Sequence, residues 1–504
     1  MQTIKKLILI FSIGILSIGS VQKRKQMKVI EVSIPSFPKS LDPREVWNYF
    51  HFMLVQNVHS TLVRIDENGR LQSYIASKWS IENEGKKFIF TIEPNAMFHD
   101  SSSVTATDVA WSLSRHLWPS SPSVTKGYLM DVLKGASDIK EGQILPSIKV
   151  LSDKSFELNL ARPYLPLLQI LSIPSLSIVK KDRPDVGAGP MILEKMGDVW
   201  SFTRFDRFFK ANLNTRSLKV RALKDTNAIE KYLDSHKVDI ILGVPIGDIA
   251  TLKLPSDYGS KRTHSLSYHH LFFNMKNESF SDLKFRRDLS HLVQNLASQS
   301  NYDSLYQKAA TGLLPLGIMP RSYYDRSVPK ISKESFLKKW AKNTKEKSLK
   351  LVIADKFLLP TFTTDLEKLL KNLGYNLTVI KADGATLVKH LKNEDYDLIS
   401  GPYVGNFQDP DGFLEPLNDK SGIRFGNFPA KALNEKIEKA RFINDAQERL
   451  KKYEKALIDF ENEFYFIPLY SLDFAIIHNK SLRVPDSSYR YEAELWHIFW
   501  QVEK

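Results

Sequence analysis

The sequence predicts a mixed α/β protein with at least two lobes. Strand-like and helix-like segments alternate along the whole chain without a fixed repeat period. A β-α-β pattern restarts late in the chain, over residues 349–400, after a Lys- and Ser-rich stretch at 321–348. Because a chain of 504 residues can bury more than one core, we expect it to divide into separate folding units.

Residues 1–20 have the features of a secretory signal peptide. Lys5 and Lys6 precede an apolar run at 7–18, and small residues follow that run, as a cleavage region requires. The run is shorter than the ~20 residues that a membrane-spanning helix needs. The basic residues at 23–25 leave an uncleaved anchor as the alternative. We therefore expect an exported protein.

Composition narrows the class of protein. The hydrophobic share of 42% and the charged share of 25% are typical of a soluble globular chain. The net charge is +14, but the lysines are mixed with acids and no basic–aromatic motif appears, so we expect no nucleic-acid partner. The absence of cysteine excludes disulfides, thiol catalysis, Cys-ligated metal sites and a lipid anchor through cysteine. The periplasm of a double-membraned bacterium fits an exported, unanchored chain.

The segment 88–115 predicts a strand, a polar loop and a capped helix. Apolar and polar residues alternate over 88–92, which is the pattern of a half-buried strand. Thr105 lies three residues before Asp108, as in a capping box, where each side chain bonds to the other residue's backbone N–H. Three apolar residues at helical spacing follow over 109–117, so one face of this helix is predicted to be buried.

The other expected elements follow from the same periodicities. Before residue 250 they are a strand at 29–34, a helix at 47–58, a hairpin at 148–160, a breaker cluster at 187–190, a strand at 200–205, a helix at 229–233 and a buried strand at 238–242. After it they are strands at 349–353, 377–380 and 397–400, helices at 361–373 and 385–391, and a long helix at 450–464.

Short motifs recur in a fixed order along the chain. They are S-L-D-P at 40–43, I-A-S-K-W at 75–79, F-H-D-S at 98–101, T-A-T-D-V at 105–109, G-A-G-P at 187–190, V-D-I at 238–240, F-F-N at 272–274, D-L-K-F-R at 282–286, D-P at 409–410 and I-P-L at 467–469. In this order they resemble family 5 solute-binding proteins, the extracytoplasmic receptors of peptide-type ABC importers. Ser101 and Glu93 depart from the family pattern, which has Gly and a basic residue there.

The resemblance implies a two-lobed periplasmic binding protein fold (type II, cluster C) with an extra inserted domain. Lobe I is then discontinuous and built from residues 28–46, 178–266 and 473–504. The inserted domain covers 47–177, and lobe II covers 267–472. The ligand of such a protein lies between lobes that close by a hinge motion.

The resemblance places the ligand near the loop at 403–413. Asp409 precedes Pro410 and is therefore pushed toward extended geometry, which favours a loop over a helix here. In peptide-binding relatives an aspartate three residues before this D-P pairs with the peptide's α-amino group, whereas this chain has Asn406. An amide is neutral, and charge-assisted hydrogen bonds are roughly twice as strong as neutral ones. The tryptophan of those relatives corresponds to Tyr403.

Five residues form the predicted ligand-binding set. They are Asn406, Tyr403, Phe407, Asp409 and Asn274. Asp409 or Asp411 could supply the charge that Asn406 lacks; the alternative is that Asp409 only caps or positions the loop.

Metal binding and catalysis find little support in the sequence. His269 and His270 are neighbours on a predicted strand and would face opposite sides, which disfavours joint metal binding. His99, beside Asp100, is interpreted as loop structure. The chain has no G-x-S-x-G elbow, no Walker-type loop and no H-E-x-x-H. We expect no metal site, no cofactor and no enzymatic activity.

The resemblance implies a monomeric periplasmic receptor that captures a peptide-like solute and delivers it to ABC permease subunits in the inner membrane. The same role with an opine, a sugar or a metal chelate is the main alternative. A sensor, or a secreted hydrolase, is the further alternative.

Overall fold

The structure is a computed structural model, and its described residues cover most of the chain. They are 28–46, 48–66, 69–210, 213–244, 249, 252–263, 266–299, 307–315, 318–320, 327–341, 347–355, 360–405, 407–414, 417, 424–472, 474–484 and 495–500. The predicted signal peptide at 1–20 and Asn406 lie outside them. Among the described helices, none combines the length and the apolar character needed to cross a bilayer.

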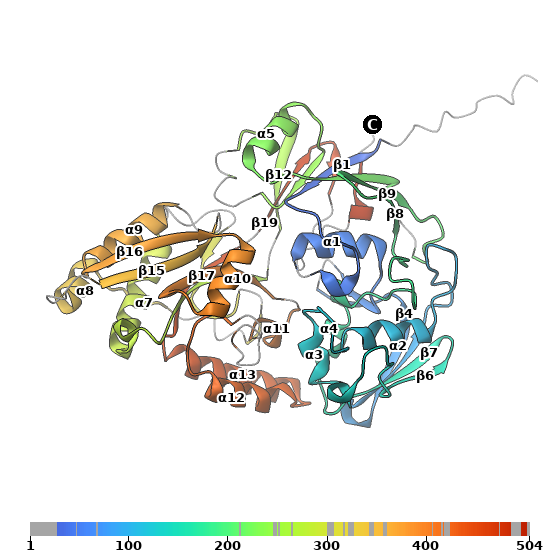
Figure 1. Ribbon diagram of the computed structural model, residues 1–504, viewed down its shortest axis with the longest axis horizontal. Coiled ribbons are helices and arrows are strands. Elements are labelled where there is room, and N and C mark those ends of the chain that lie inside the picture. The colour runs from blue at the N-terminus through green and yellow to red at the C-terminus, as the bar shows by residue number, and fades with distance from the viewer. Residues whose placement is uncertain are drawn as a thin grey trace, which may run out of the picture.

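Three sheets organise the molecule into the units that Figure 1 shows. The lobe I sheet has seven strands in the order β12-β19-β11-β1-β10-β9-β8. Its strands are β1 (Ile30–Ile34), β8 (Met191–Lys195), β9 (Val199–Arg204), β10 (Ser217–Ala222), β11 (Ile240–Leu242), β12 (Tyr258–Thr263) and β19 (Phe474–Asn479). One sheet thus gathers strands from the start, the middle and the end of the chain.

A second sheet lies in the inserted region, with four strands in the order β4-β5-β7-β6. They are β4 (Ala76–Glu82), β5 (Lys87–Ile92), β6 (Ile148–Ser152) and β7 (Ser155–Asn159), with the small pair β2 (Val63–Ile65) and β3 (Leu71–Ser73) beside them in sequence. The predicted hairpin at 148–160 is present as β6 and β7. Phe90 and Phe156 stack across β5 and β7 with ring centroids 5.0 Å apart, so the apolar face of this sheet is closely packed.

The lobe II sheet has six strands in the order β14-β18-β13-β17-β15-β16. Its strands are β13 (Ser267–Phe273), β14 (Gln307–Ala309), β15 (Lys347–Ala354), β16 (Tyr375–Ala382), β17 (Leu398–Val404) and β18 (Phe466–Leu472). Strand β15 pairs in parallel with both β16 and β17, as the predicted β-α-β pattern requires. The pair β20 (Leu482–Arg483) and β21 (Phe499–Trp500) lies near the end of the chain.

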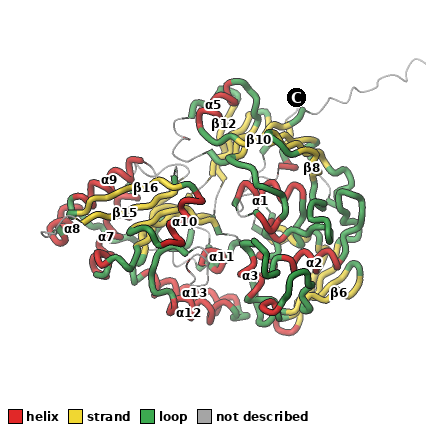
Figure 2. The backbone as a smooth tube through the Cα atoms, in the orientation of Figure 1, coloured by secondary structure: helices red, strands yellow, loops and turns green. Residues whose placement is uncertain are grey.

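Helices border the strands of each unit (Figure 2). In lobe I and the inserted region they are α1 (Tyr49–Val58), α2 (Ala106–Arg115), α3 (Lys126–Met130), α4 (Leu167–Ile170) and α5 (Thr226–Asp234). In lobe II they are α7 (Leu283–Ala297), α8 (Lys333–Trp340), α9 (Pro360–Lys371), α10 (Gly384–Asn393), α11 (Asp411–Leu414), α12 (Lys431–Arg441) and α13 (Ala446–Glu461). Helix α1 lies in the predicted inserted domain by number, but its apolar residues pack in the core of lobe I.

The capping box that the sequence predicts at α2 is confirmed. The Thr105 hydroxyl accepts the backbone N–H of Asp108 at 3.3 Å, and the Asp108 carboxylate accepts the backbone N–H of Thr105 at 2.9 Å. Four residues earlier, Ser101 has φ of 69°, the left-handed conformation that glycine adopts most easily. This explains physically why the family pattern has glycine at the position of Ser101.

The chain passes twice between the sheets of lobe I and lobe II, from β12 to β13 and from β18 back to β19. The strand ends that flank the two passages lie side by side, because β13 and β18 are antiparallel neighbours and the Ser471 hydroxyl donates to the Ser267 carbonyl at 3.1 Å. A pair of adjacent crossings allows one lobe to rotate against the other with little change inside either lobe.

Glu461, at the end of α13, has a strongly perturbed acidity. Burial raises its pKa from 4.5 to about 8, against a hydrogen bond that its carboxylate accepts from the Leu313 N–H at 2.6 Å. An acid whose pKa is higher in the folded state stays protonated there at pH values between its unfolded and folded pKa, where the unfolded state has already lost the proton. Since the folded state binds more protons in that window, the free energy of unfolding falls as pH rises from 4.5 to about 8.

We therefore expect Glu461→Gln to flatten the pH dependence of stability. The amide oxygen still accepts from Leu313, but no ionisation opposes burial. Above pH 8 the variant should exceed the wild type by up to about 5 kcal/mol in free energy of unfolding, and below pH 4.5 the two should agree. Urea titrations across this range test it, with Glu435→Gln on the exposed face of α12 as control. If the free energies of unfolding of the wild type and the variant changed with pH in parallel, the raised pKa of Glu461 would be contradicted.

Candidate functional site

The predicted site loop follows directly from a central strand of lobe II. In β17, Tyr403 lies opposite Tyr268 of β13. The Gly405 N–H then donates to the Leu266 carbonyl at 2.9 Å, which keeps the chain beside the first crossing between the lobes. The loop therefore begins where lobe II meets lobe I.

Two glycines let this loop fold back on itself. A Cβ atom on Gly405 would lie 2.1 Å from the Phe413 ring, and one on Gly412 would lie 2.7 Å from the Phe407 carbonyl oxygen. Real Cβ atoms do not approach other atoms that closely, so glycine is required at both positions. The compact loop brings Tyr403, Phe407 and Asp409 into one short stretch of structure.

The expectation of a loop rather than a helix at 403–413 is partly wrong. Helix α11 begins at Asp411, directly after Pro410. The restriction imposed by proline applies to the residue before it, Asp409, while proline itself is compatible with the first turn of a helix.

Tyr403 is half-buried, and its hydroxyl donates to the Gly412 carbonyl at 3.2 Å. Its ring centroid lies 5.4 Å from that of Tyr268. These contacts fix the orientation of the ring at the end of β17. Ligand contact by Tyr403 stays a prediction.

Asp409 is buried and paired with an arginine. Its two carboxylate oxygens accept from the guanidinium of Arg449 at 2.6 and 2.7 Å, and it also accepts the Asp411 N–H at 3.0 Å. Burial raises the pKa of Asp409, and the Arg449 charge opposes that rise. These contacts agree with the interpretation that Asp409 positions the loop.

Asp411 is also committed to protein partners. Its carboxylate lies 2.8 Å from Nε of Arg441 and accepts from the hydroxyls of Tyr453 at 3.0 Å and Tyr164 at 2.7 Å. Burial alone would raise the pKa of Asp411, but the charge and hydrogen bonds of Arg441, with the bond from Tyr164, hold it below its ordinary value. Each of the two candidate carboxylates thus has its own arginine.

Phe407 and Asn274 lie in two different parts of the molecule and do not contact a common site. Phe407 is 1% exposed and belongs to the apolar core of the inserted region, with its ring edge-on to Tyr128 at 5.3 Å. Asn274 follows the far end of β13, and its amide donates to the Tyr396 carbonyl at 2.7 Å. Because a strand of this length spans roughly 20 Å, Asn274 lies well away from the loop. Ligand contact by either residue stays a prediction.

The sequence did not point to Arg441 or Tyr164 as parts of this cluster. They approach Asp411 from 30 and 247 residues away along the chain, so no local spacing reveals them.

His270 and His99 each bond to a backbone carbonyl of the protein. His270 stacks on Tyr268 with centroids 4.3 Å apart, and its Nε2 bonds to the Leu313 carbonyl at 2.9 Å. Burial lowers the pKa of His269 to about 3 and that of His270 to about 4. His99 bonds to the Gly189 carbonyl at 3.0 Å. Within the described part of the chain, no group of three or more potential metal ligands comes together.

Comparison with known proteins agrees with this architecture. The sequence profile of "Bacterial extracellular solute-binding proteins, family 5 Middle" matches residues 70–425. A dipeptide-binding protein of Lactococcus lactis is 22% identical over 485 residues, covering 87% of each chain. The oligopeptide-binding protein OppA of Bacillus subtilis is 23% identical over 521 residues, covering 91% of this chain and 90% of its own.

Solved structures share the fold. A periplasmic binding protein of Helicobacter pylori in complex with the peptide STSA superposes with a TM-score of 0.79 at 16% identity, covering 96% of this chain and 100% of its own. NikZ of Campylobacter jejuni in complex with Ni(L-His) superposes with a TM-score of 0.77 at 19% identity, covering 94% and 99%.

Proposed function

The chain belongs to the family 5 bacterial extracellular solute-binding proteins, and we propose that it is a periplasmic receptor that captures a peptide-like solute between its lobes for an ABC importer. The observation that carries this proposal is the match to the family over most of the chain, together with two sheets joined by two adjacent crossings. Relatives named as peptide-binding proteins support a peptide as ligand. Permease contact, a monomeric state and the absence of turnover belong to the same proposal.

The ligand is proposed to lie beside the end of β17, against Tyr403 and Asn406. An extended peptide can bond there through its backbone, which gives affinity with little selectivity for side chains. Closure of the lobes would then remove the ligand from water, and a few polar contacts would fix its orientation.

Native mass spectrometry of the purified protein, followed by calorimetry on ligand-stripped protein, tests the proposal. Peptides of two to five residues should produce heat and raise the melting temperature. Absence of both effects for the whole series, with a different molecule found bound, would replace the peptide by that molecule. Hydrolysis of the added peptides would instead favour the hydrolase alternative.

A second candidate ligand is a solute that has no free ammonium group beside the end of β17. The observation that favours it is that Asn406 is neutral while Asp409 and Asp411 are each paired with an arginine. A buried ammonium needs a counter-charge, since an unpaired charge is costly to bury. Free and N-acetylated forms of one peptide separate the two ligands: preference for the acetylated form supports the second, and preference for the free form supports the first.

We expect Tyr403→Ala to weaken binding of the ligand identified by mass spectrometry about tenfold, or 1.4 kcal/mol, because an aromatic surface beside the ligand is lost. Tyr375→Ala, on the edge strand β16 of the same sheet, is the matched control and should leave affinity unchanged. Equal affinities of wild type and Tyr403→Ala would remove Tyr403 from the site.

A further inference from the structure

The inserted region and lobe II touch directly, away from the two crossings of the chain. Helix α11 and the end of α12 lie next to α3 and α4 (Figure 1). The apolar part of this contact is Phe407, which leaves its own lobe and packs in the core of the inserted region beside Tyr128. A side chain buried in the other unit can leave it only when the lobes separate.

The polar part of the contact is one carboxylate shared by both sides. Within lobe II, Asp411 is held by Arg441 and by the hydroxyl of Tyr453. From the inserted region, the hydroxyl of Tyr164 donates at 2.7 Å to Oδ2 of this carboxylate, while Tyr453 donates to Oδ1. Tyr164 is 2% exposed and Asp411 is 1% exposed, so this hydrogen bond forms out of water. A hydrogen bond to a charged group is stronger than one between neutral groups.

Exposed groups surround this buried centre. The guanidinium of Arg162 bonds to the Glu438 carboxylate at 2.6 Å and lies 3.5 Å from the centroid of the Phe442 ring. Asp131, on the inserted region, lies 3.3 Å from Nη1 of Arg441. The contact thus has an apolar anchor, a buried charged hydrogen bond and a polar rim, which is the anatomy of a specific interface.

We propose that this contact is a latch that holds the two lobes together without a ligand. Tyr128 and Tyr164 form its inserted-region side, and Phe407 and Asp411 form its lobe II side. The inference goes beyond the proposed function, because it assigns a closed population to the empty receptor. The lobe II side of the latch belongs to the same short loop as the proposed ligand contacts, so a ligand would favour the closed state only if it also bound the inserted region or lobe I more tightly there.

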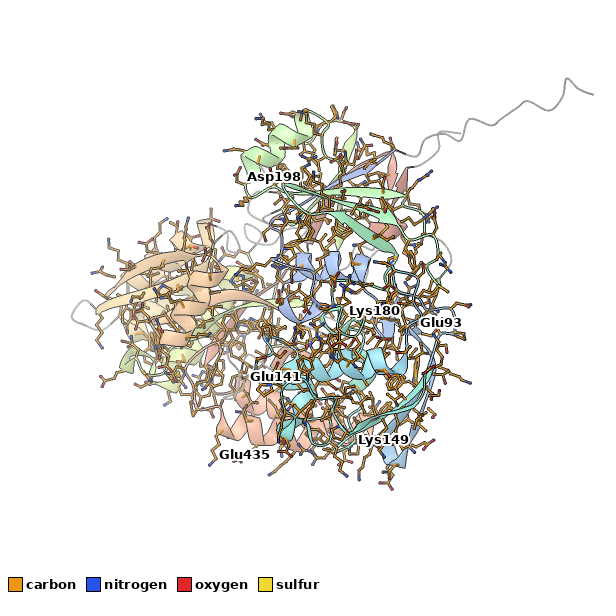
Figure 3. All side chains as sticks on the ribbon, turned by 45° about the vertical axis from the view of Figure 1, so that its right-hand side comes forward. Glu93, Glu141, Lys149, Lys180, Asp198 and Glu435 are labelled. Atoms are coloured by element: carbon orange, nitrogen blue, oxygen red, sulfur yellow. The ribbon has the colours of Figure 1, made fainter. Side chains whose placement is uncertain are left out.

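The absence of cysteine makes the latch directly measurable. Spin labels at Lys149→Cys and Glu435→Cys report the distance between the inserted region and lobe II, since Figure 3 places these exposed residues on opposite sides of the contact. A second pair, Lys149→Cys and Asp198→Cys, lies within the inserted region and lobe I and should not respond. All measurements use the full chain after removal of any bound solute.

The decisive comparison is between two tyrosines on the same carboxylate. Tyr164→Phe removes the hydroxyl that crosses between the lobes, and Tyr453→Phe removes one that stays within lobe II. We expect the empty wild type to show mainly the short distance. Tyr164→Phe should add a longer distance and lower the closed-to-open ratio about tenfold, whereas Tyr453→Phe should keep the wild-type distribution while lowering the melting temperature.

Three results would overturn the latch: a wild type that shows only the long distance, a Tyr164→Phe distribution equal to that of the wild type, or equal opening by both variants. If Tyr164→Phe does not fold, Arg162→Gln combined with Asp131→Asn removes the exposed rim and leaves the core intact. A shift toward the long distance, smaller than the one expected for Tyr164→Phe, then supports the latch. The absence of any shift overturns it. Because no ligand is added, failure of the latch is separate from failure of the proposed function.

Discussion

Replacing Arg449 by methionine is expected to lower the free energy of unfolding by about 3–5 kcal/mol, because it leaves the Asp409 carboxylate buried without its partner. Asp409 is 8% exposed, and Arg449 donates to both of its oxygens at 2.6 and 2.7 Å. Water cannot replace the lost guanidinium without opening the loop. Urea-induced unfolding monitored by tryptophan fluorescence measures the difference.

Two further variants separate loss of a buried partner from loss of positive charge. Asp409→Leu combined with Arg449→Met removes both charges and should recover most of the lost stability, since an apolar pair avoids the desolvation cost. Lys436→Met breaks an exposed pair with Asp459, whose atoms lie 2.7 Å apart, and should cost about 0.5 kcal/mol or less. A double variant as unstable as Arg449→Met would show that packing, not charge, determines the effect.

The same pair illustrates what the sequence could predict. The sequence allows two interpretations of Asp409, as a source of charge for a ligand or as a residue that positions the loop, and its bidentate partner Arg449 agrees with the second. Nothing in the 40 residues that separate Asp409 from Arg449 along the chain indicates that their side chains are in contact. Whether a carboxylate is available for a ligand depends on its tertiary neighbours, which a single sequence does not contain.

Local features were predictable because their causes are local. The Thr105–Asp108 capping box, the hairpin of β6 and β7 and the β-α-β order of lobe II each depend on residues close in sequence, and all are present. The order of strands within the sheets depends instead on long-range pairing, such as β19 between β11 and β12. Phe407 shows the same limit in the site: an apolar residue in a loop gives no sign that it will enter another unit's core.

The cause of the breaker cluster at 187–190 is visible only in three dimensions. Composition predicts a turn there. In the structure the cluster lies against the end of α1, where the Gly189 N–H donates to the Val58 carbonyl at 2.8 Å. A Cβ atom added to Gly187 would lie 1.8 Å from that same carbonyl oxygen. The glycine is therefore needed for the close approach of two backbones.

We accordingly expect Gly187→Ala to lower the free energy of unfolding by about 3 kcal/mol, the upper part of the range for overpacking, because the obstacle is backbone and cannot rotate away. Gly127→Ala in α3 is the matched control, since a Cβ atom there meets nothing within 4 Å. That control should be neutral or stabilising by up to about 1 kcal/mol, as alanine lowers the entropy of the unfolded chain. Equal melting temperatures for the two variants would show that α1 and the 187–190 segment can move apart freely. In that case the motif would have to be explained by its turn alone.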